Sequence, residues 1–399
     1  MARILFVWEL GLGFGHLSPY IGVVRALRKQ KHEVIFAARD VENADRVFAR
    51  DGVPILQAPL SVHRVTNPYR ITFNYAQLMH NTGFADLQDL FGRVKAWQHI
   101  FQYVRPDVMV FDHSPTGLLA SRMVKVKRII GGSGFLIPPA ETPLPLMRYW
   151  NNSDAEKIKK SEQMVLNTSN KVLQALKLPP MKNLAEMFQS DAEWLMSFPE
   201  MDHYPERKSG NYVGMFSPPE YGEDPVWPAG KGKKIFAYLY NYKTLPALLK
   251  LLNRTGSRVL IHGPQIPVPV RKKFSSPTVR FSDKPLNVQR LGPECDLVIT
   301  NGTFGTTAAF MMAGKPALMI PTNLERMMVA RRVVGMGAGL AAPANKPEML
   351  GPRLKALFQN DKYRKAAEAF AAKYKGESMA TQTEKMVATL EKLLPPPPG

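Results

Sequence analysis

The stretch that decides the fold is residues 3–16, Arg-Ile-Leu-Phe-Val-Trp-Glu-Leu-Gly-Leu-Gly-Phe-Gly-His. The apolar run at 3–8 predicts a buried strand, and the glycines that follow predict a tight turn. Apolar residues at helical spacing from about 19 to 31 predict a helix, and residues 34–38 predict a second strand. This order of strand, glycine turn, helix and strand is typical of the first unit of a Rossmann-like fold.

The same alternation continues along the chain and starts again in its second half. Further buried strands are predicted at 108–112, 128–132, 235–239, 258–261, 296–300 and 316–321. Prolines and glycines are concentrated before residue 234, which is typical of a connection between domains. We therefore predict one Rossmann-like domain over residues 1–210, a linker over 211–233, and a second Rossmann-like domain over 234–399. The helical end of the chain is expected to be able to pack back on the first domain.

Composition narrows the classes of protein. The 399 residues are 45% hydrophobic and 22% charged, which excludes a disordered or collagen-like chain. The net charge of +20 favours anionic partners such as nucleotides, acidic lipid headgroups, polyanionic glycans or nucleic acid. No nucleic-acid-binding motif is present, which disfavours the last of these. The single cysteine, Cys295, excludes a disulfide within the chain and a cysteine-based metal site.

The first apolar run is short and ends at glycines, so we interpret it as a buried strand rather than as a signal peptide. No segment has the length of a membrane span. We expect a cytoplasmic protein whose basic surface can lie against the anionic inner face of the membrane.

Five segments, taken together and in order, resemble one enzyme family. They are Gly-His-Leu-Ser-Pro at 15–19, Gly-Ser-Gly-Phe-Leu-Ile-Pro-Pro at 132–139, and the segments 296–307, 321–326 and 335–340. Their spacing is similar to that of the inverting GT-B glycosyltransferases of the UDP-glucuronosyl and macrolide glycosyltransferase type, bacterial branch. The resemblance implies an α/β protein of GT-B architecture, with two Rossmann-like domains facing a central cleft. It also implies that the first domain binds the acceptor and the second binds the nucleotide-sugar.

Inverting sugar transfer needs a base that removes the proton of the attacking hydroxyl, and histidine is suited to this near neutral pH. The resemblance identifies His16 as that base and Asp112, at the end of a buried strand, as the carboxylate that holds its imidazole. Asp112 could instead be a carboxylate that only anchors a loop. Asp107 precedes the same strand and lies at the wrong end, whereas His113 is a reserve candidate for the base.

The resemblance also implies the residues that bind each substrate. For the donor these are Gly13, Gly15, Phe281, Lys284, Pro285, Asn301, Gly302, Thr303, Gly305, Thr306, Thr307, Glu325 and Arg326. For the acceptor they are Phe135, Pro138 and Trp150. Backbone N–H groups, the threonine hydroxyls and a helix dipole at 301–307 can hold a diphosphate without a metal ion. We therefore expect no metal and no cofactor, only a nucleotide diphosphate-sugar, with UDP as the expected nucleotide, as co-substrate of this hexosyltransferase.

Three positions depart from the family pattern. Relatives usually carry His at the position of Asn301, Glu at that of Ala309 and Gln at that of Arg326. Two alternatives therefore stay open: a catalytically degenerate homologue that acts as a partner or activator, and a sugar-nucleotide epimerase. The acceptor is expected to be a small molecule, lipid-linked or anionic. The basic segments 122–128 and 157–160 predict that the positive charge lies on the acceptor side of the cleft.

Overall fold

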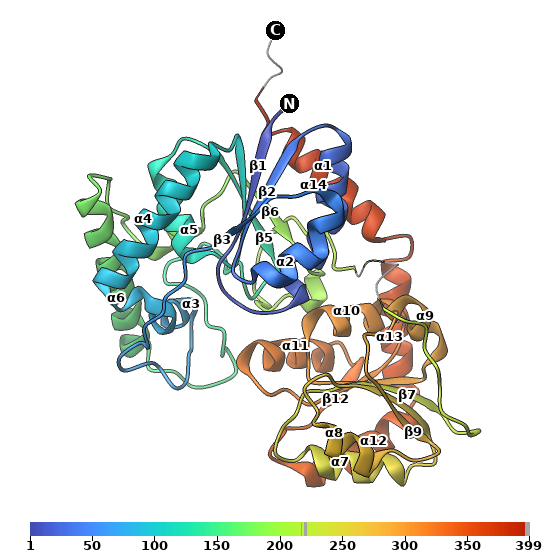
Figure 1. Cartoon of the computed structure of the whole chain (residues 1–399). Coiled ribbons are helices and arrows are strands. Elements are labelled where there is room, and N and C mark those ends of the chain that lie inside the picture. Colours follow the sequence, from blue (N-terminus) through green and yellow to red (C-terminus); the bar gives the residue numbers. More distant parts are fainter. Residues whose placement is uncertain (217, 219–221, 396–399) are drawn as a thin grey trace. The chain divides into compact units, whose positions relative to one another are not determined.

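A computed structural model describes residues 1–216, 218 and 222–395 of the chain. The chain divides into two compact units (Figure 1). The first unit comprises Met1–Phe198, Tyr204–Gly214 and the end of the chain from Ala380, and the second comprises Pro199–His203 and Met215–Met379. Within the described residues, no helix is long and apolar enough to cross a membrane.

The first unit contains a parallel sheet of six strands. In chain order they are β1 (Arg3–Trp8), β2 (Glu33–Ala38), β3 (Ile55–Gln57), β4 (Val108–Asp112), β5 (Lys127–Gly132) and β6 (Ala192–Leu195). Their order across the sheet is β3-β2-β1-β4-β5-β6. The winding reverses direction between β1 and β4, so this is the doubly wound order in which ligands bind beyond the carboxyl ends of those two strands.

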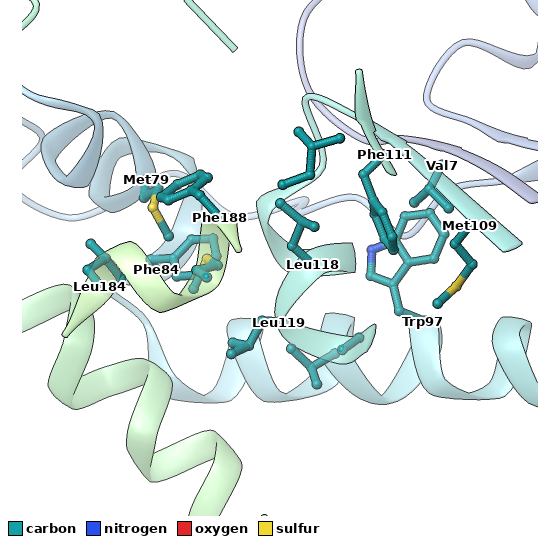
Figure 2. Close-up of a cluster of buried hydrophobic side chains, with 14 of the residues drawn as sticks. Val7, Met79, Phe84, Trp97, Met109, Phe111, Leu118, Leu119, Leu184 and Phe188 are labelled. Atoms are coloured by element: carbon teal, nitrogen blue, oxygen red, sulfur yellow. The ribbon is translucent and has the colours of Figure 1, made fainter. Parts of the chain in front are cut away.

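Helices cover the two faces of this sheet. They are α1 (Ile21–Lys29), α2 (Val41–Phe48), α3 (Tyr75–Met79), α4 (Leu87–Val104), α5 (Pro115–Ala120), α6 (Ala155–Ala175) and α14 (Met379–Glu391). Trp97 of α4 is fully buried in the main core of the unit. Figure 2 shows its ring against Val7 of β1 and Met109 and Phe111 of β4. These continuous apolar strands are buried on both faces, as parallel strands are when helices cover each side.

The last helix, α14, belongs to the first unit and lies beside α1 (Figure 1). Gln382 of α14 donates a hydrogen bond to the carbonyl of Gly214 at 3.0 Å, and Gln30 donates to Glu391 at 2.8 Å. A Cβ atom on Gly22 of α1 would lie 2.1 Å from the hydroxyl of Thr383. Close contact between the two helices therefore requires a glycine at position 22.

The second unit repeats the same winding. Its strands are β7 (Lys234–Tyr238), β8 (Arg258–His262), β9 (Val279–Ser282), β10 (Leu297–Thr300), β11 (Ala317–Met319) and β12 (Gly339–Ala341). Their order is β12-β11-β10-β7-β8-β9, with all pairs parallel. Its helices are α7 (Leu245–Asn253), α8 (Val268–Phe274), α9 (Val288–Glu294), α10 (Phe304–Met312), α11 (Leu324–Gly335), α12 (Leu350–Gln359) and α13 (Lys362–Lys373). The reversal point of this sheet lies between β7 and β10.

The predicted linker, 211–233, is divided between the two units. The N–H of Val213 donates to the carbonyl of Leu195 at 2.9 Å, which attaches 211–214 to the edge of the first sheet. The N–H of Glu223 donates to the carbonyl of Pro285 at 2.9 Å, so this part of the stretch pairs with the second unit. Residues 217 and 219–221 of the predicted linker lie outside the described residues.

Candidate active site

The first candidate half-site lies at the reversal point of the first sheet. Trp8 and Asp112 are register partners at the ends of β1 and β4, so the loops that follow these strands start side by side. The loop after β1 contains the glycine turn and a short helix, Phe14–His16. Predicted residues His16 and Asp112, 96 positions apart, are therefore brought together.

His16 and Asp112 form a tight pair. The Nδ1 atom of His16 lies 2.5 Å from Oδ1 of Asp112, whose side chain is almost completely buried. The other oxygen, Oδ2, accepts a hydrogen bond from the hydroxyl of Tyr20 at 2.8 Å. A carboxylate beside Nδ1 favours the tautomer that carries its proton there, which leaves Nε2 as the basic nitrogen. The arrangement can therefore orient an imidazole as a proton acceptor.

Sequence reasoning did not find Tyr20. A sequence signal exists, however, on the neighbouring strand β5. Gly131 is the register partner of Asp112, and a Cβ atom there would lie 2.6 Å from the Tyr20 hydroxyl. Glycine at this buried strand position therefore makes room for the phenol that holds the carboxylate.

The imidazole of His16 packs against the Trp8 ring and, at Nε2, against the backbone of Gly11. The Trp8 ring stacks on it, with centroids 5.1 Å apart and an angle of 17° between the planes. Gly11 has φ +84°, and a Cβ atom there would lie 2.2 Å from Nε2. The predicted residues Gly13 and Gly15 lie in the same loop, but a Cβ atom on either would meet nothing within 4 Å. The close approach therefore occurs at Gly11, which was not among the predicted site residues.

His113 stands beside this pair but is a poor base. Its ring centroid lies 6.0 Å from that of His16, and its backbone has φ +41°. Within the part of the chain that the structure describes, neither of its buried ring nitrogens has a hydrogen-bond partner. Burial, followed by the nearby His16, lowers the pKa of His113 to about 3. The imidazole is therefore neutral near pH 7 and has little tendency to take up a proton.

The lowered pKa of His113 predicts a pH dependence of stability. Because an unfolded histidine has a pKa near 6.5, acid protonates the unfolded chain first, and stability falls as the pH drops from about 6.5 towards 3. The slope approaches about 1.4 kcal/mol per pH unit for this one group. We expect His113→Asn, in which Asn tolerates the positive φ, to remove that slope. Urea unfolding of both proteins at pH 7.5, 6.0 and 5.0 measures it, and parallel pH curves would contradict the interpretation.

The buried ion pair between Glu9 and Arg93 holds the residues that follow His113 in place. Glu9 follows β1, is 1% exposed and accepts hydrogen bonds from the N–H of Thr116 at 2.9 Å and the hydroxyl of Ser114 at 3.2 Å. Its other oxygen accepts from Nη1 of Arg93 on α4 at 3.0 Å. Burial raises the pKa of Glu9, although Arg93 and Thr116 oppose this. Glu9 thus ties β1, α4 and the start of α5 together, and sequence analysis did not predict this role.

The predicted acceptor residues follow β5. Phe135 is buried, and its ring lies edge to face with that of His113, 6.5 Å between centroids, which places it next to the neighbour of His16. Pro138 is buried, and Trp150 packs edge to face against Tyr149. Glu162 of α6 braces this segment by accepting the N–H of Leu144 at 3.1 Å.

The second candidate half-site lies at the reversal point of the second sheet, where Asn301 follows β10. Asn301 is fully buried: its Oδ1 accepts the N–H of Tyr240 at 2.6 Å, and its Nδ2 donates to the carbonyl of Ile320 at 2.8 Å. The hydroxyl of Thr307 is likewise directed at the carbonyl of Thr303, at 2.8 Å. These two predicted donor-binding side chains are therefore engaged with the protein's own backbone and brace the turn, and their contact with a donor stays a prediction.

Groups that can hold an anion remain at this turn. The first N–H groups of α10 have no partner within the helix, as at every helix start, and they begin at Phe304 after Gly302 and Thr303. Gly305 and Thr306 are half-buried in the first turn. Gly302 has φ +85°, and a Cβ atom there would lie 2.8 Å from the carbonyl oxygen of Arg326.

Arg326 brings a positive charge to the same turn. Its guanidinium carbon lies 4.1 Å above the ring of Tyr240, and its Nη1 donates to Thr322 at 2.7 Å. Glu325 precedes it in the first turn of α11 and is half-buried. Tyr240 was not predicted as a site residue. The turn therefore combines a helix N-terminus with a cation held by stacking.

Of the other predicted donor residues, Phe281 lies in β9, and Lys284 and Pro285 follow it at the same edge of the sheet. β9 is three strands from β10, which is about 14 Å at the usual strand spacing. Lys284 is exposed and pairs with Glu223 at 2.5 Å, and the carbonyl of Pro285 accepts the N–H of Glu223. Phe281 packs partly into the core of the unit.

Comparison with known proteins identifies the type of fold. Residues 271–392 match the family described as erythromycin biosynthesis protein CIII-like, C-terminal domain. No curated protein matches the chain in sequence.

Solved structures similar to the chain include the calicheamicin glycosyltransferase CalG4, with 16% identity, a TM-score of 0.73 and 99% of each chain covered. Spinosyn rhamnosyltransferase SpnG has 16% identity and a TM-score of 0.69, over 98% of this chain and all of that one. The glycosyltransferase SnogD from Streptomyces nogalater has 19% identity and a TM-score of 0.64, over 97% and 99%. SpnG also matches as complexes with thymidine diphosphate and with spinosyn aglycone. The predicted fold class is thus confirmed: the chain has the GT-B fold of these glycosyltransferases, and its residues 271–392 match the erythromycin biosynthesis protein CIII-like C-terminal domain.

Proposed function

We propose that the protein is an inverting glycosyltransferase that moves a sugar from a nucleotide diphosphate-sugar to an acceptor hydroxyl. The observation that carries this proposal is the His16–Asp112 pair, 2.5 Å apart, with Tyr20 on the second carboxylate oxygen. A degenerate homologue has no need of this fully oriented set. An epimerase, which forms no bond to an acceptor, has no need of a base for an acceptor hydroxyl.

The step follows from this geometry. Nε2 of His16 takes the proton of the acceptor hydroxyl as the oxygen attacks the anomeric carbon from the face opposite the diphosphate. The new C–O bond forms while the bond from the anomeric carbon to the phosphate oxygen breaks, and the nucleoside diphosphate leaves with that electron pair. Asp112 stabilises the imidazolium that results. Attack from the opposite face inverts the anomeric configuration.

The donor half of the proposal rests on the turn before α10. Its helix N-terminus and Arg326 together can neutralise a diphosphate, so we propose that no divalent metal is needed. The comparison with SpnG, solved with thymidine diphosphate, supports a nucleoside diphosphate as part of the donor. Both TDP and UDP are candidates.

Calorimetric titration of TDP and UDP tests the donor half. We expect Arg326→Gln to weaken the better nucleotide roughly tenfold or more, because a charged hydrogen bond contributes about 1.5–3 kcal/mol. The matched control is Lys355→Gln, which removes the same charge from an exposed position on α12. A chelator should leave the wild-type affinity unchanged. Failure of the wild type to bind either nucleotide would favour the catalytically degenerate homologue. Normal nucleotide binding by Arg326→Gln would show that the phosphates lie elsewhere.

We propose a small-molecule aglycone as the acceptor. The positions of the two basic segments, 122–128 and 157–160, also bear on the expectation that the positive charge lies on the acceptor side. The basic segment 122–128 leads into the start of β5, whereas Asp112 stands at the far end of neighbouring β4. Only the segment 157–160, on α6, belongs to the helix that braces the residues after β5. The expectation that both basic segments lie on the acceptor side is therefore wrong, because one lies at the opposite edge of the sheet. SpnG, solved with spinosyn aglycone, supports an aglycone acceptor.

The glycine turn supplies a matched pair of variants. Gly11→Ala places a methyl group 2.2 Å from Nε2 of His16 at a backbone angle that alanine rarely adopts. We expect this variant to lose at least tenfold in transfer rate, with donor affinity unchanged. Gly15→Ala adds the same methyl group to the same loop in open space and should keep the rate within about twofold. Equal rates in the two variants would show that the position of the imidazole does not limit transfer.

A further inference from the structure

A cavity lies at the other end of the first sheet, where β5 begins. Its volume is about 560 Å³. It is formed by the segment between α5 and β5, by the chain after α6 and by the residue before β6. The lining residues are Ser121, Arg122, Val124, Lys125, Val126, Lys127, Arg128, Leu178, Pro179 and Asp191.

This cavity is separate from the proposed catalytic pair. Lys127 is the register partner of Val108, and Gly131 is the register partner of Asp112. A strand rises by about 3.3 Å per residue, and the lining residue Arg128 is three residues from Gly131, so the cavity edge lies about 10 Å from Asp112 along the sheet. A ligand in the cavity would therefore not be the acceptor that His16 deprotonates.

The cavity carries an excess of positive charge. Four of its lining residues are cations and one, Asp191, is an acid. Asp191 is already engaged, because one oxygen lies 2.7 Å from Nζ of Lys127 and the other accepts the N–H of Arg128 at 2.9 Å. The nearest acid to Arg122 is Glu186, at 3.7 Å. Lys125 is exposed and has no ion pair among residues 1–216, 218 and 222–395.

Two guanidinium groups, those of Arg122 and Arg128, line the same cavity. Arg128 is half-buried, and its Nη1 makes only a long contact, 3.4 Å, with the hydroxyl of Ser121. Burial lowers the pKa of Arg128, and neighbouring Arg122 lowers it further, against the opposing effect of Asp191. Half-buried like charges repel, and an anion between them would relieve both the repulsion and the loss of hydration.

The remaining wall is apolar. This apolar part of the cavity wall consists of Val124, Val126, Leu178 and Pro179. A phosphate offers up to two charges and three acceptor oxygens, which suits two guanidinium forks and a lysine better than one carboxylate does. We propose that this cavity is a binding site for the phosphate group of an organic phosphate that also carries an apolar part, distinct from the donor and acceptor sites of the proposed transferase.

The test uses two double variants that remove equal charge. Arg122→Gln/Lys125→Gln neutralises the cavity, and Lys157→Gln/Lys160→Gln neutralises two exposed lysines on α6 of the same unit. The probes are inorganic phosphate and dihexanoyl phosphatidic acid below its micelle concentration, with dihexanoyl phosphatidylcholine as the zwitterionic control. Calorimetric titration gives each affinity. We expect wild type and the α6 variant to bind phosphatidic acid alike, and the cavity variant to bind it at least tenfold more weakly.

Each outcome supports or overturns the proposal. Tighter binding of phosphatidic acid than of inorganic phosphate supports a site for a phosphate that carries an apolar part, and equal binding of the two overturns the apolar part of the proposal. Binding of neither probe by the wild type overturns the site, and so does an equal loss in both double variants. Should the cavity variant fail to fold, Lys125→Gln alone replaces it, with an expected weakening of about threefold. The nucleotide titrations are independent of all these readouts.

Discussion

His16→Ala is expected to lower the rate of sugar transfer about 10²–10⁴-fold, the range that general-base catalysis typically supplies. The substitution removes the only atom that the proposed step uses to take the proton, Nε2, and leaves the stacking surface of Trp8 in place. The affinity for TDP or UDP should stay within about twofold, because the donor groups belong to the other unit.

Two further variants test whether the groups that hold the His16 imidazole contribute to the rate of transfer. Asp112→Asn should lower the rate similarly, because it removes the charge that stabilises the imidazolium. Tyr20→Phe should lower it less, since only one of the two hydrogen bonds on Asp112 is lost. Initial rates at saturating donor, with folding checked by thermal unfolding, measure all three. Transfer by His16→Ala near the wild-type rate would remove His16 from the mechanism.

Arg93→Met is expected to lower the free energy of unfolding by roughly 3–5 kcal/mol at pH 7.5, because it leaves Glu9 as a buried charge without its cation. The side chains of Arg93 and Glu9 are 5% and 1% exposed, so water cannot replace the lost partner. Without Arg93, the pKa of Glu9 should rise further, so Glu9 becomes protonated and uncharged at a higher pH. The loss of unfolding free energy should therefore shrink as the pH falls towards the usual pKa range of glutamate.

Urea unfolding at pH 7.5 and 5.5 measures this effect. Arg46→Met is the matched control: Arg46 pairs with Glu42 on the surface of α2, and exposed pairs contribute about 0–1 kcal/mol. The double variant Glu9→Gln/Arg93→Met should recover part of the loss, because it removes the buried charge as well. Equal losses for Arg93→Met and Arg46→Met would mean that the buried pair does not stabilise the fold.

The long buried strands of the fold could be predicted because continuous apolar runs between turn residues have few other interpretations. The strands β1, β4 and β7 were predicted to within about one residue. The outer strands β3, β6, β9 and β12 were not predicted, because each three- or four-residue run includes a polar residue or glycine (Gln57, Glu193, Arg280 and Gly339), whereas the equally short β10 and β11 are almost wholly apolar. The helical stretch 347–394 is three helices in the structure, of which the last, α14, belongs to the other unit, a long-range contact that local pattern does not encode.

The candidate site was predicted where a residue type and its place in the fold determine its chemistry. His16 follows β1 and Asp112 ends β4, and the parallel order of those strands brings them together. Tyr20, Glu9 and Arg93 were missed because their roles depend on side-chain packing between distant elements. Asn301 was assigned to phosphate by analogy, whereas both ends of its amide are engaged with backbone from two other loops.

The central claim is that one base-assisted displacement transfers the sugar, and the stereochemistry of the product tests it most directly. An α-linked nucleotide-glucose donor, incubated with the wild-type protein and an aglycone panel, yields a glycoside whose anomeric proton coupling reports its configuration. The account predicts a β-linked product, formed by the wild type and lost in His16→Ala. An α-linked product, or a β-linked product formed equally well without His16, would contradict it.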